Sequence, residues 1–252
     1  MGMPENFDWA AWVARWERMQ ERYLVGRAER FAIMAGLVRD TQGPAPRALD
    51  LGCGTGSLMA ALLEAIPDAY VVGIDLDSSL LLLAEKRLAA YGERSQTHLA
   101  DMRESAWLAG IPERFDAVVS ATALHWLNPE QLAGLYAQIA GRLRPGGIFL
   151  NADHVGSDQP LIQQAWSRQR AEALAAQSDL AAEDWDSFIN AYLEVLGPDA
   201  RAARQQTLGE WQGVEDGMPL SWHFQALQQA GFSSVDCFWR SDCDAIYGAF
   251  LA

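Results

Sequence analysis

The segment Leu49-Asp-Leu-Gly-Cys-Gly-Thr-Gly56 constrains the fold of this chain more than any other part of the sequence. Its pattern indicates a short strand, a turn with three alternating glycines and the first turn of a helix. Because glycine has no Cβ atom, a backbone rich in glycine can turn sharply and approach a ligand closely. The segment therefore predicts a binding loop at the carboxyl end of a strand.

Short apolar runs and helical stretches alternate after this loop. We expect strands at 48–51, 70–74, 97–100, 115–121 and 148–152, and helices at 58–66, 78–91 and 129–143. A helix at 220–230 and two strands at 235–239 and 245–251 follow, the strands forming an antiparallel hairpin. Strands that alternate with helices form right-handed crossovers and a sheet covered on both faces. The predicted fold class is α/β, a Rossmann-like, doubly wound, mostly parallel sheet of seven strands.

Two helical segments interrupt or precede this pattern. Residues 6–38 carry an aromatic stripe at helical spacing, and residues 155–218 contain few strand formers and three helical stretches. The second segment is too long for an ordinary connection between a strand and a helix. We expect three units: a helical N-terminal cap at 1–40, a core formed by 41–154 and 219–252, and a helical insertion or substrate lid at 155–218.

The composition excludes several classes of partner. The chain of 252 residues has 33 acidic and 19 basic side chains, a formal charge of −14, and so lacks a basic face for nucleic acid or a membrane anchor. Its three cysteines have no metal-ligand spacing, which predicts neither a metal site nor a disulfide framework. There is no signal-peptide pattern and no apolar run of 18 residues. We expect a cytoplasmic protein, monomer or homodimer, with a small-molecule substrate.

Acidic residues stand at the ends of the first three expected strands. Asp50 precedes the glycines, where a phosphate-binding loop disfavours a carboxylate but a cationic ligand favours one. Asp75 stands where an acid can accept hydrogen bonds from both hydroxyls of a ribose. Asp101, with Met102 behind it, can accept from an adenine amino group while the thioether lies on the ring. For each acid, the alternative is a helix N-cap or a solvated surface charge.

At this point the chain resembles the class I S-adenosylmethionine-dependent methyltransferases, small-molecule branch. The matching segments are Ala48-Leu-Asp-Leu-Gly-Cys-Gly-Thr-Gly56, Gly73-Ile-Asp75, Ala100-Asp-Met102, Phe115-Asp-Ala-Val-Val-Ser120 and Leu143-Arg-Pro-Gly-Gly-Ile-Phe149. The stretch Ala121-Thr-Ala-Leu-His-Trp-Leu127 is similar to one in trans-aconitate methyltransferase-like proteins. The resemblance implies S-adenosylmethionine as cofactor and S-adenosylhomocysteine as product.

The resemblance also implies a set of cofactor contacts. Gly52, Gly54 and Gly56 would lie beside the methionine portion with Asp50 nearby, Asp75 would bind the ribose, and Asp101 with Met102 would meet the adenine. The carbonyl near Ala121 would meet the cofactor's amino group, and Tyr23 would touch the methionine portion. Cys53, inside the loop, and Leu76, after Asp75, complete the expected cofactor-binding residues. The alternative for Cys53 is a small residue that only fills space in the loop.

Methyl transfer requires the protein to hold a nucleophile in line, exclude water and, for some acceptors, remove a proton. His125 and His154 follow the fourth and fifth strands and are the candidate catalytic residues, with a packed loop histidine as the alternative. Trp12 and Trp126 are expected in an aromatic acceptor pocket, and Arg27 is a candidate clamp for a substrate carboxylate. The alternative for Trp12 is packing in the core, and the alternative for Arg27 is a solvated charge on a helix.

We therefore expect a methyltransferase that acts on O, N or C of a small molecule. A lyase or cyclase that uses the same cofactor without an external acceptor remains an alternative, as does a non-catalytic cofactor-binding protein. The glycine spacing disfavours an NAD-dependent dehydrogenase. Nothing in the sequence identifies the acceptor, because the residues that would select it lie in 1–38 and 155–218.

Overall fold

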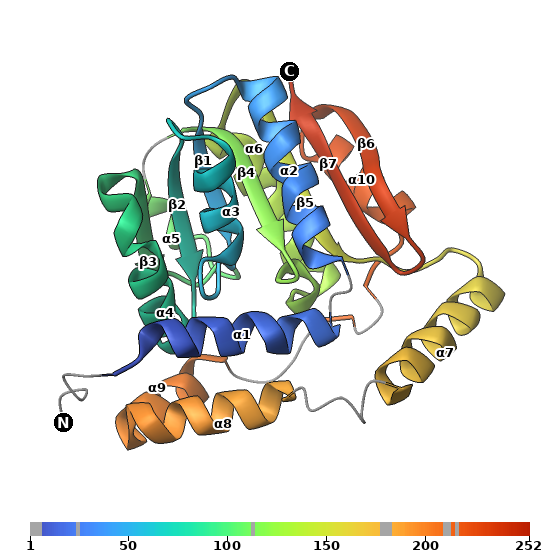
Figure 1. The fold of residues 1–252 in the computed structure, drawn as a ribbon. Helices are drawn as coiled ribbons and strands as arrows, with labels where there is room; N and C mark the ends of the chain where they lie inside the picture. The colour runs from blue at the N-terminus through green and yellow to red at the C-terminus, as the bar shows by residue number, and fades with distance from the viewer. Residues whose placement is uncertain (1–6, 24–25, 112–113, 177–182, 209–212, 215–216) are drawn as a thin grey trace.

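A seven-stranded sheet forms the centre of the computed structural model, which describes residues 7–23, 26–111, 114–176, 183–208, 213–214 and 217–252 (Figure 1). The strands are β1 (Arg47–Leu51), β2 (Tyr70–Asp75), β3 (Ser95–Leu99), β4 (Phe115–Ala121), β5 (Leu143–His154), β6 (Phe232–Ser241) and β7 (Asp244–Leu251). Their order is β3-β2-β1-β4-β5-β7-β6, with β1 to β5 parallel and β7 antiparallel to both neighbours. The predicted fold class is confirmed.

Helices cover both faces of the sheet, because successive residues of each buried strand point to opposite sides. On one face Ala48 and Val71 pack against α2 (Arg27–Gln42), α3 (Ser57–Ala65) and α4 (Ser78–Leu88). On the other, Leu49 and Val72 pack against α5 (Trp107–Gly110), α6 (Pro129–Arg142) and α10 (Leu220–Gln229). Figure 1 shows α2 and α3 in front of the sheet and α6 and α10 behind it.

The remaining α-helices lie at the carboxyl edge of the parallel strands (Figure 1). They are α1 (Trp9–Tyr23), α7 (Pro160–Ala176), α8 (Trp185–Leu196) and α9 (Pro198–Leu208). Trp16 of α1 is buried in a cluster with Leu83 of α4 and Phe188 of α8, so α1 is packed between the core and the insertion. Of the expected cap at 1–40, α1 lies at this edge, whereas α2 belongs to the helical layer on the sheet.

Several local expectations were wrong. Residues 6–38 do not form one helix: α2 begins after Gly26, whose φ of 74° is left-handed and breaks the helical path. Asp77 is the N-cap of α4, because its side chain accepts from the backbone N–H groups of Ser79 and Leu80. That helix ends at Leu88 and continues as the 3₁₀ turn η1 (Ala89–Arg94).

Strand β5 is also longer than the expected 148–152. Its end pairs with β7, with His154 opposite Asp244, and its start pairs with β4, with Leu143 opposite Phe115. Pairing on both sides therefore extends the strand beyond its apolar run. This extension carries Asp153 and His154 to the carboxyl edge, beside the 3₁₀ turn η2 (Leu124–Trp126) that follows β4.

Candidate active site

A cavity of about 510 Å³ opens at the carboxyl edge of the sheet. The predicted site residues that line it are Arg27, Asp50, Gly52, Cys53, Gly54, Asp75, Leu76, Asp101, Met102, Ala121, His125, Trp126 and His154. Helices α1, α8 and α9 complete the wall with Trp16, Trp185 and Arg204. The volume is typical of a small-molecule pocket, roughly 300–1,000 Å³.

The glycine loop forms the floor of this cavity and depends on the missing Cβ atoms. Gly52 has a φ of 69°, and a Cβ atom added there would lie 2.4 Å from the Cβ atom of Ala123. Gly56, with a φ of 73°, is the N-cap of α3 and does not line the cavity; a Cβ atom there would meet Leu88 at 2.9 Å. Buried Cys53 fills space within the loop, and burial raises the pKa of its thiol well above the usual value.

Among the described residues, no cation forms an ion pair with either of two carboxylates at the strand ends, Asp50 and Asp75. Asp50 is 1% exposed, and its Oδ2 atom has no hydrogen-bond partner among the described residues. Burial, together with the charge of Asp75, raises the pKa of Asp50 to about 8. Asp75 accepts hydrogen bonds of 2.8 Å from the backbone N–H groups of Gly54 and Asp77, and burial raises its pKa to about 6. This end of the cavity therefore favours a ligand with positive charge and hydrogen-bond donors.

Asp101 differs from Asp50 and Asp75, because an arginine side chain already forms an ion pair with its carboxylate. The guanidinium of Arg103 donates to both carboxylate oxygens at 2.6–2.9 Å and also to the backbone carbonyl of Thr207 in α9. Burial opposes the shift, but the hydrogen bonds from Arg103 lower the pKa of Asp101. A second arginine of α9, Arg204, forms an ion pair with Asp77 at the same end of the cavity. Sequence reasoning missed both arginines, since neither stands in a motif.

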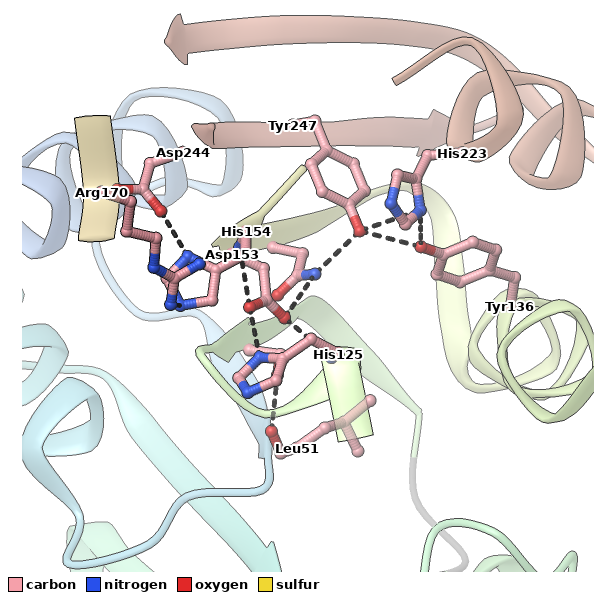
Figure 2. A network of polar contacts seen from close by, with 11 residues as sticks. Leu51, His125, Tyr136, Asp153, His154, Arg170, His223, Asp244 and Tyr247 are labelled. Carbon is pink, nitrogen blue, oxygen red and sulfur yellow. Dashed lines mark hydrogen bonds and ion pairs between the residues drawn. The ribbon is translucent and has the colours of Figure 1, made fainter. Parts of the chain in front are cut away.

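At the other end of the cavity, two histidines are each held by a carboxylate (Figure 2). The Nδ1 atom of His125 lies 2.6 Å from Oδ1 of Asp153, and the Nδ1 atom of His154 lies 2.6 Å from Oδ1 of Asp244. The two imidazole rings are 5.2 Å apart. Arg170 of α7 donates to Nε2 of His154 at 3.0 Å. The structure thus brings together both predicted catalytic candidates with three charged residues that the sequence did not single out.

The remaining predicted site residues, Trp12, Trp126 and Tyr23, do not all line the cavity. Trp12 does not line the cavity; its ring packs against Phe188 and Tyr192, 5.6 and 5.2 Å away between centroids. Trp126 is 43% exposed and lies in the wall. Tyr23 ends α1, but its side chain lies outside the described residues.

Arg27 is already engaged on the side of the cavity where Asp50 lies. It forms an ion pair with Glu17 of α1 and lies over the ring of Phe31, 4.6 Å from its centroid. Its charge acts on Asp50, lowering the pKa of that carboxyl against the larger effect of burial. Arg27 is therefore placed beside the acidic end of the cavity, whereas the two histidines mark the other end.

Two findings concern metals and membranes. In the part of the chain that the structure describes, no three His, Cys, Asp or Glu side chains are grouped so as to hold a metal ion. Across the same residues, no helix combines the length and the apolar character needed to span a bilayer.

Comparisons with known proteins agree on the family to which this chain belongs. A family model described as a methyltransferase domain matches residues 48–147. Trans-aconitate 2-methyltransferase from Acidovorax ebreus is 30% identical over 182 residues, covering 69% of this chain and 64% of its own length. Carboxy-S-adenosyl-L-methionine synthase from Trichodesmium erythraeum is 30% identical over 180 residues, covering 70% of each protein. The chain belongs to the class I S-adenosylmethionine-dependent methyltransferase family.

Solved structures show the same fold at low identity. Magnesium protoporphyrin IX methyltransferase from Synechocystis PCC 6803 aligns with a TM-score of 0.61 at 15% identity, covering 96% of this chain and 95% of that one. The S-adenosylmethionine-dependent methyltransferase SibL aligns with a TM-score of 0.56 at 21% identity, covering 88% and 54%. The chain spans about three fifths of the length of the trans-aconitate 2-methyltransferases that it matches.

Proposed function

We propose that this protein transfers the methyl group of S-adenosylmethionine to a small-molecule acceptor. The observation that carries the proposal is the pair of buried carboxylates, Asp50 and Asp75, at the end of a cavity floored by the glycine loop. A buried carboxyl whose Oδ2 atom lacks a partner favours a ligand with positive charge and donors. S-adenosylmethionine, with a sulfonium, an ammonium and a ribose diol, has both.

The cavity residues fit this cofactor. Asp75 would accept from the ribose hydroxyls, Gly52 and Gly54 would lie against the methionine portion, and Asp50 would face its positive charge. Arg27, predicted as a substrate clamp, is better placed for the cofactor's carboxylate, since its charge acts on Asp50. The adenine would share Asp101 with Arg103, and Met102 lies beside the loop. Once bound, the cofactor supplies an electrophilic methyl group.

The rest of the chain would orient the acceptor and exclude water. Trp16 and Trp185 close the cavity from α1 and α8, with their rings 5.3 Å apart between centroids. His125 and His154 face the acceptor end and are candidates for proton removal. Arg170 has no ion pair with any described residue, so an acceptor with an anionic group fits beside it. Relatives named for trans-aconitate, a carboxylate, support this assignment.

Isothermal titration calorimetry tests the cofactor assignment. Asp75→Asn should weaken S-adenosylhomocysteine binding at least tenfold, about 1.4 kcal/mol, because it removes half of the acceptor capacity for the ribose diol. Asp68→Asn, at an exposed position of the same loop-and-strand unit, should bind like the wild type. A wild-type protein that binds neither S-adenosylmethionine nor S-adenosylhomocysteine would end the proposal.

A lyase or cyclase remains the second candidate, because one relative is named a synthase of a modified S-adenosylmethionine and not a methyltransferase. Product analysis separates the two. S-adenosylhomocysteine that accumulates only when an acceptor is present supports transfer, whereas methylthioadenosine released from S-adenosylmethionine alone supports the lyase. A monomeric or homodimeric state and the lack of nucleic-acid binding stay predictions from the sequence.

A further inference from the structure

We infer that Gln20 of α1 binds the amino-acid end of the cofactor, with its side-chain amide donating to the carboxylate and accepting from the ammonium group. The inference rests on the proposed function and adds a binding residue that stands in no motif. Gln20 lines the cavity, yet the residue is only 7% exposed. It thus presents a polar group that packing has nearly enclosed to a space that a ligand would fill.

The amide of Gln20 has almost no polar contacts within the protein. Among the described residues, its one hydrogen-bond contact is 3.6 Å from Nε2 to the sulfur of the adjacent Met19, and a thioether is a weak acceptor. A primary amide offers two N–H donors and an accepting oxygen, so most of its capacity is unused. Leaving a buried amide without partners costs about 1–3 kcal/mol. A ligand that supplied the missing partners would recover that cost.

The position of Gln20 on α1 places it near the glycine loop. Trp16, one turn earlier on the same helical face, lies against that loop, because its ring is 3.9 Å from the point where a Cβ atom on Gly54 would stand. Residues four apart on a helix are separated by about 6 Å along its axis. Gln20 therefore lies about one turn from the loop that is proposed to contact the methionine portion of the cofactor.

The contacts of Glu17 fix this face of α1 to the same end of the cavity. Its carboxylate pairs with Arg27 of α2 and accepts a hydrogen bond of 2.7 Å from the hydroxyl of Ser57, the first residue of α3. Glu17 and Gln20 are three residues apart, so their side chains are neighbours on the helix surface. Arg27 also lines the cavity. The amide and the guanidinium proposed to bind the cofactor's carboxylate therefore border the same part of it.

An uncharged amide suits the amino-acid end of S-adenosylmethionine. That end carries an ammonium group and a carboxylate on one carbon, and an amide carries donors and an acceptor in one plane. In the proposed binding mode, Asp50 faces the positive group and Arg27 faces the negative one. A further charge from α1 would be repelled by one of the two ligand groups, whereas the amide of Gln20 can interact favourably with both.

Two ligands that differ in the amino-acid end test this assignment. S-adenosylhomocysteine carries that end, whereas methylthioadenosine has a methyl group in its place. Gln20→Met keeps the length of the side chain and removes the amide. In calorimetry, the variant should bind S-adenosylhomocysteine about tenfold more weakly than the wild type. Its affinity for methylthioadenosine, measured by competition with S-adenosylhomocysteine, should stay within about twofold of the wild-type value, because this ligand offers the amide nothing to bind.

Urea unfolding without ligand separates binding from folding. Gln20→Met should be at least as stable as the wild type, because an apolar side chain of similar shape replaces a buried amide without partners. Gln20→Ala, a smaller replacement, should show the same difference between the two ligands. Arg18→Met, on the exposed face of the same helix, should leave both affinities unchanged.

Two results would overturn the inference. One is an unchanged affinity of both Gln20 variants for S-adenosylhomocysteine, which would mean that the amide does not contact the cofactor. The other is an equal loss of affinity for both ligands, which would mean that Gln20 only supports the shape of the cavity. A wild-type protein that binds no S-adenosylhomocysteine refutes the proposed function itself, so the two failures are distinguishable.

Discussion

Asp50 shows how a single residue can be unfavourable for folding and useful for binding. It lies at the end of β1, 1% exposed, with Asp75 close enough to raise its pKa further. A carboxyl of this kind costs free energy to ionise unless a cation is present, and such groups gather at functional sites. The same position in a purely structural loop would be better filled by a neutral side chain.

Asp50→Asn should therefore stabilise the ligand-free protein while weakening S-adenosylmethionine binding. The pKa of Asp50 rises from 3.8 to about 8 on folding, so its contribution to stability is lost as the pH rises through that interval. The gain of the variant should be near zero at pH 4 and reach a few kcal/mol by pH 9, at about 1.4 kcal/mol per pKa unit. Urea unfolding at pH 4, 6, 7.5 and 9 measures it. A difference that does not change with pH would contradict the burial of an ionisable Asp50.

At the scale of elements, α9 is joined to the core by charge as well as by packing. Arg204 reaches Asp77, the N-cap of α4, and both side chains are at most 10% exposed. Arg103 adds a hydrogen bond to the carbonyl of Thr207. The insertion is therefore fixed to the ends of β2 and β3, next to the place proposed for the adenosine.

Arg204→Ala should destabilise the protein by about 3–5 kcal/mol, because it leaves the buried carboxylate of Asp77 without its cation. Arg201→Ala, on an exposed face of the same helix where Arg201 bonds to Asn190, should cost less than about 1 kcal/mol. Chemical denaturation of the two variants compares them directly. Equal losses would show that α9 depends on packing and helix propensity and not on this ion pair.

The whole molecule forms the cavity from segments that are far apart in the chain. Trp16 comes from the N-terminal helix, Gly52 from the core loop, and Arg204 from the insertion. A ligand that fills this space would contact all three segments at once. Its binding would thus join the insertion and the first helix to the sheet.

Hydrogen–deuterium exchange with S-adenosylhomocysteine should show this coupling. Amide exchange should slow in α1, in the glycine loop and in α9, while β6, at the far edge of the sheet, should exchange at an unchanged rate. The peptides of β6 serve as the internal control. Protection confined to the glycine loop would mean that α1 and the insertion do not close on the cofactor.

Much of the fold follows from the sequence because the signals are local. The strand at Phe115–Ala121 was predicted to the residue, since a strand buried on both faces is a nearly continuous apolar run. The helix expected from residue 129 begins at Pro129, and a capping box between Asn128 and Gln131 fixes its start. The break at Gly26 was missed, because helical residues stand on both sides of it and a single glycine is tolerated within a helical pattern.

The sequence by itself determined the sheet, the binding edge and the acids at that edge. The physical reason is that parallel strands end at one edge, so residues that follow successive strands must lie near one another. Tertiary structure decided which of those acids are available: Arg103 pairs with Asp101, whereas no cation among the described residues pairs directly with Asp50.

Tertiary structure also decided the partners of the two histidines. His154 contacts Asp244, 90 residues away, and Arg170 on an inserted helix. His125, in the turn after β4, contacts Asp153 at the end of the neighbouring strand β5. Such pairs depend on how helices and strands pack, and no local pattern of side chains encodes them. The chemistry that a residue can perform follows from its type, but its protonation and its partners follow from the fold around it.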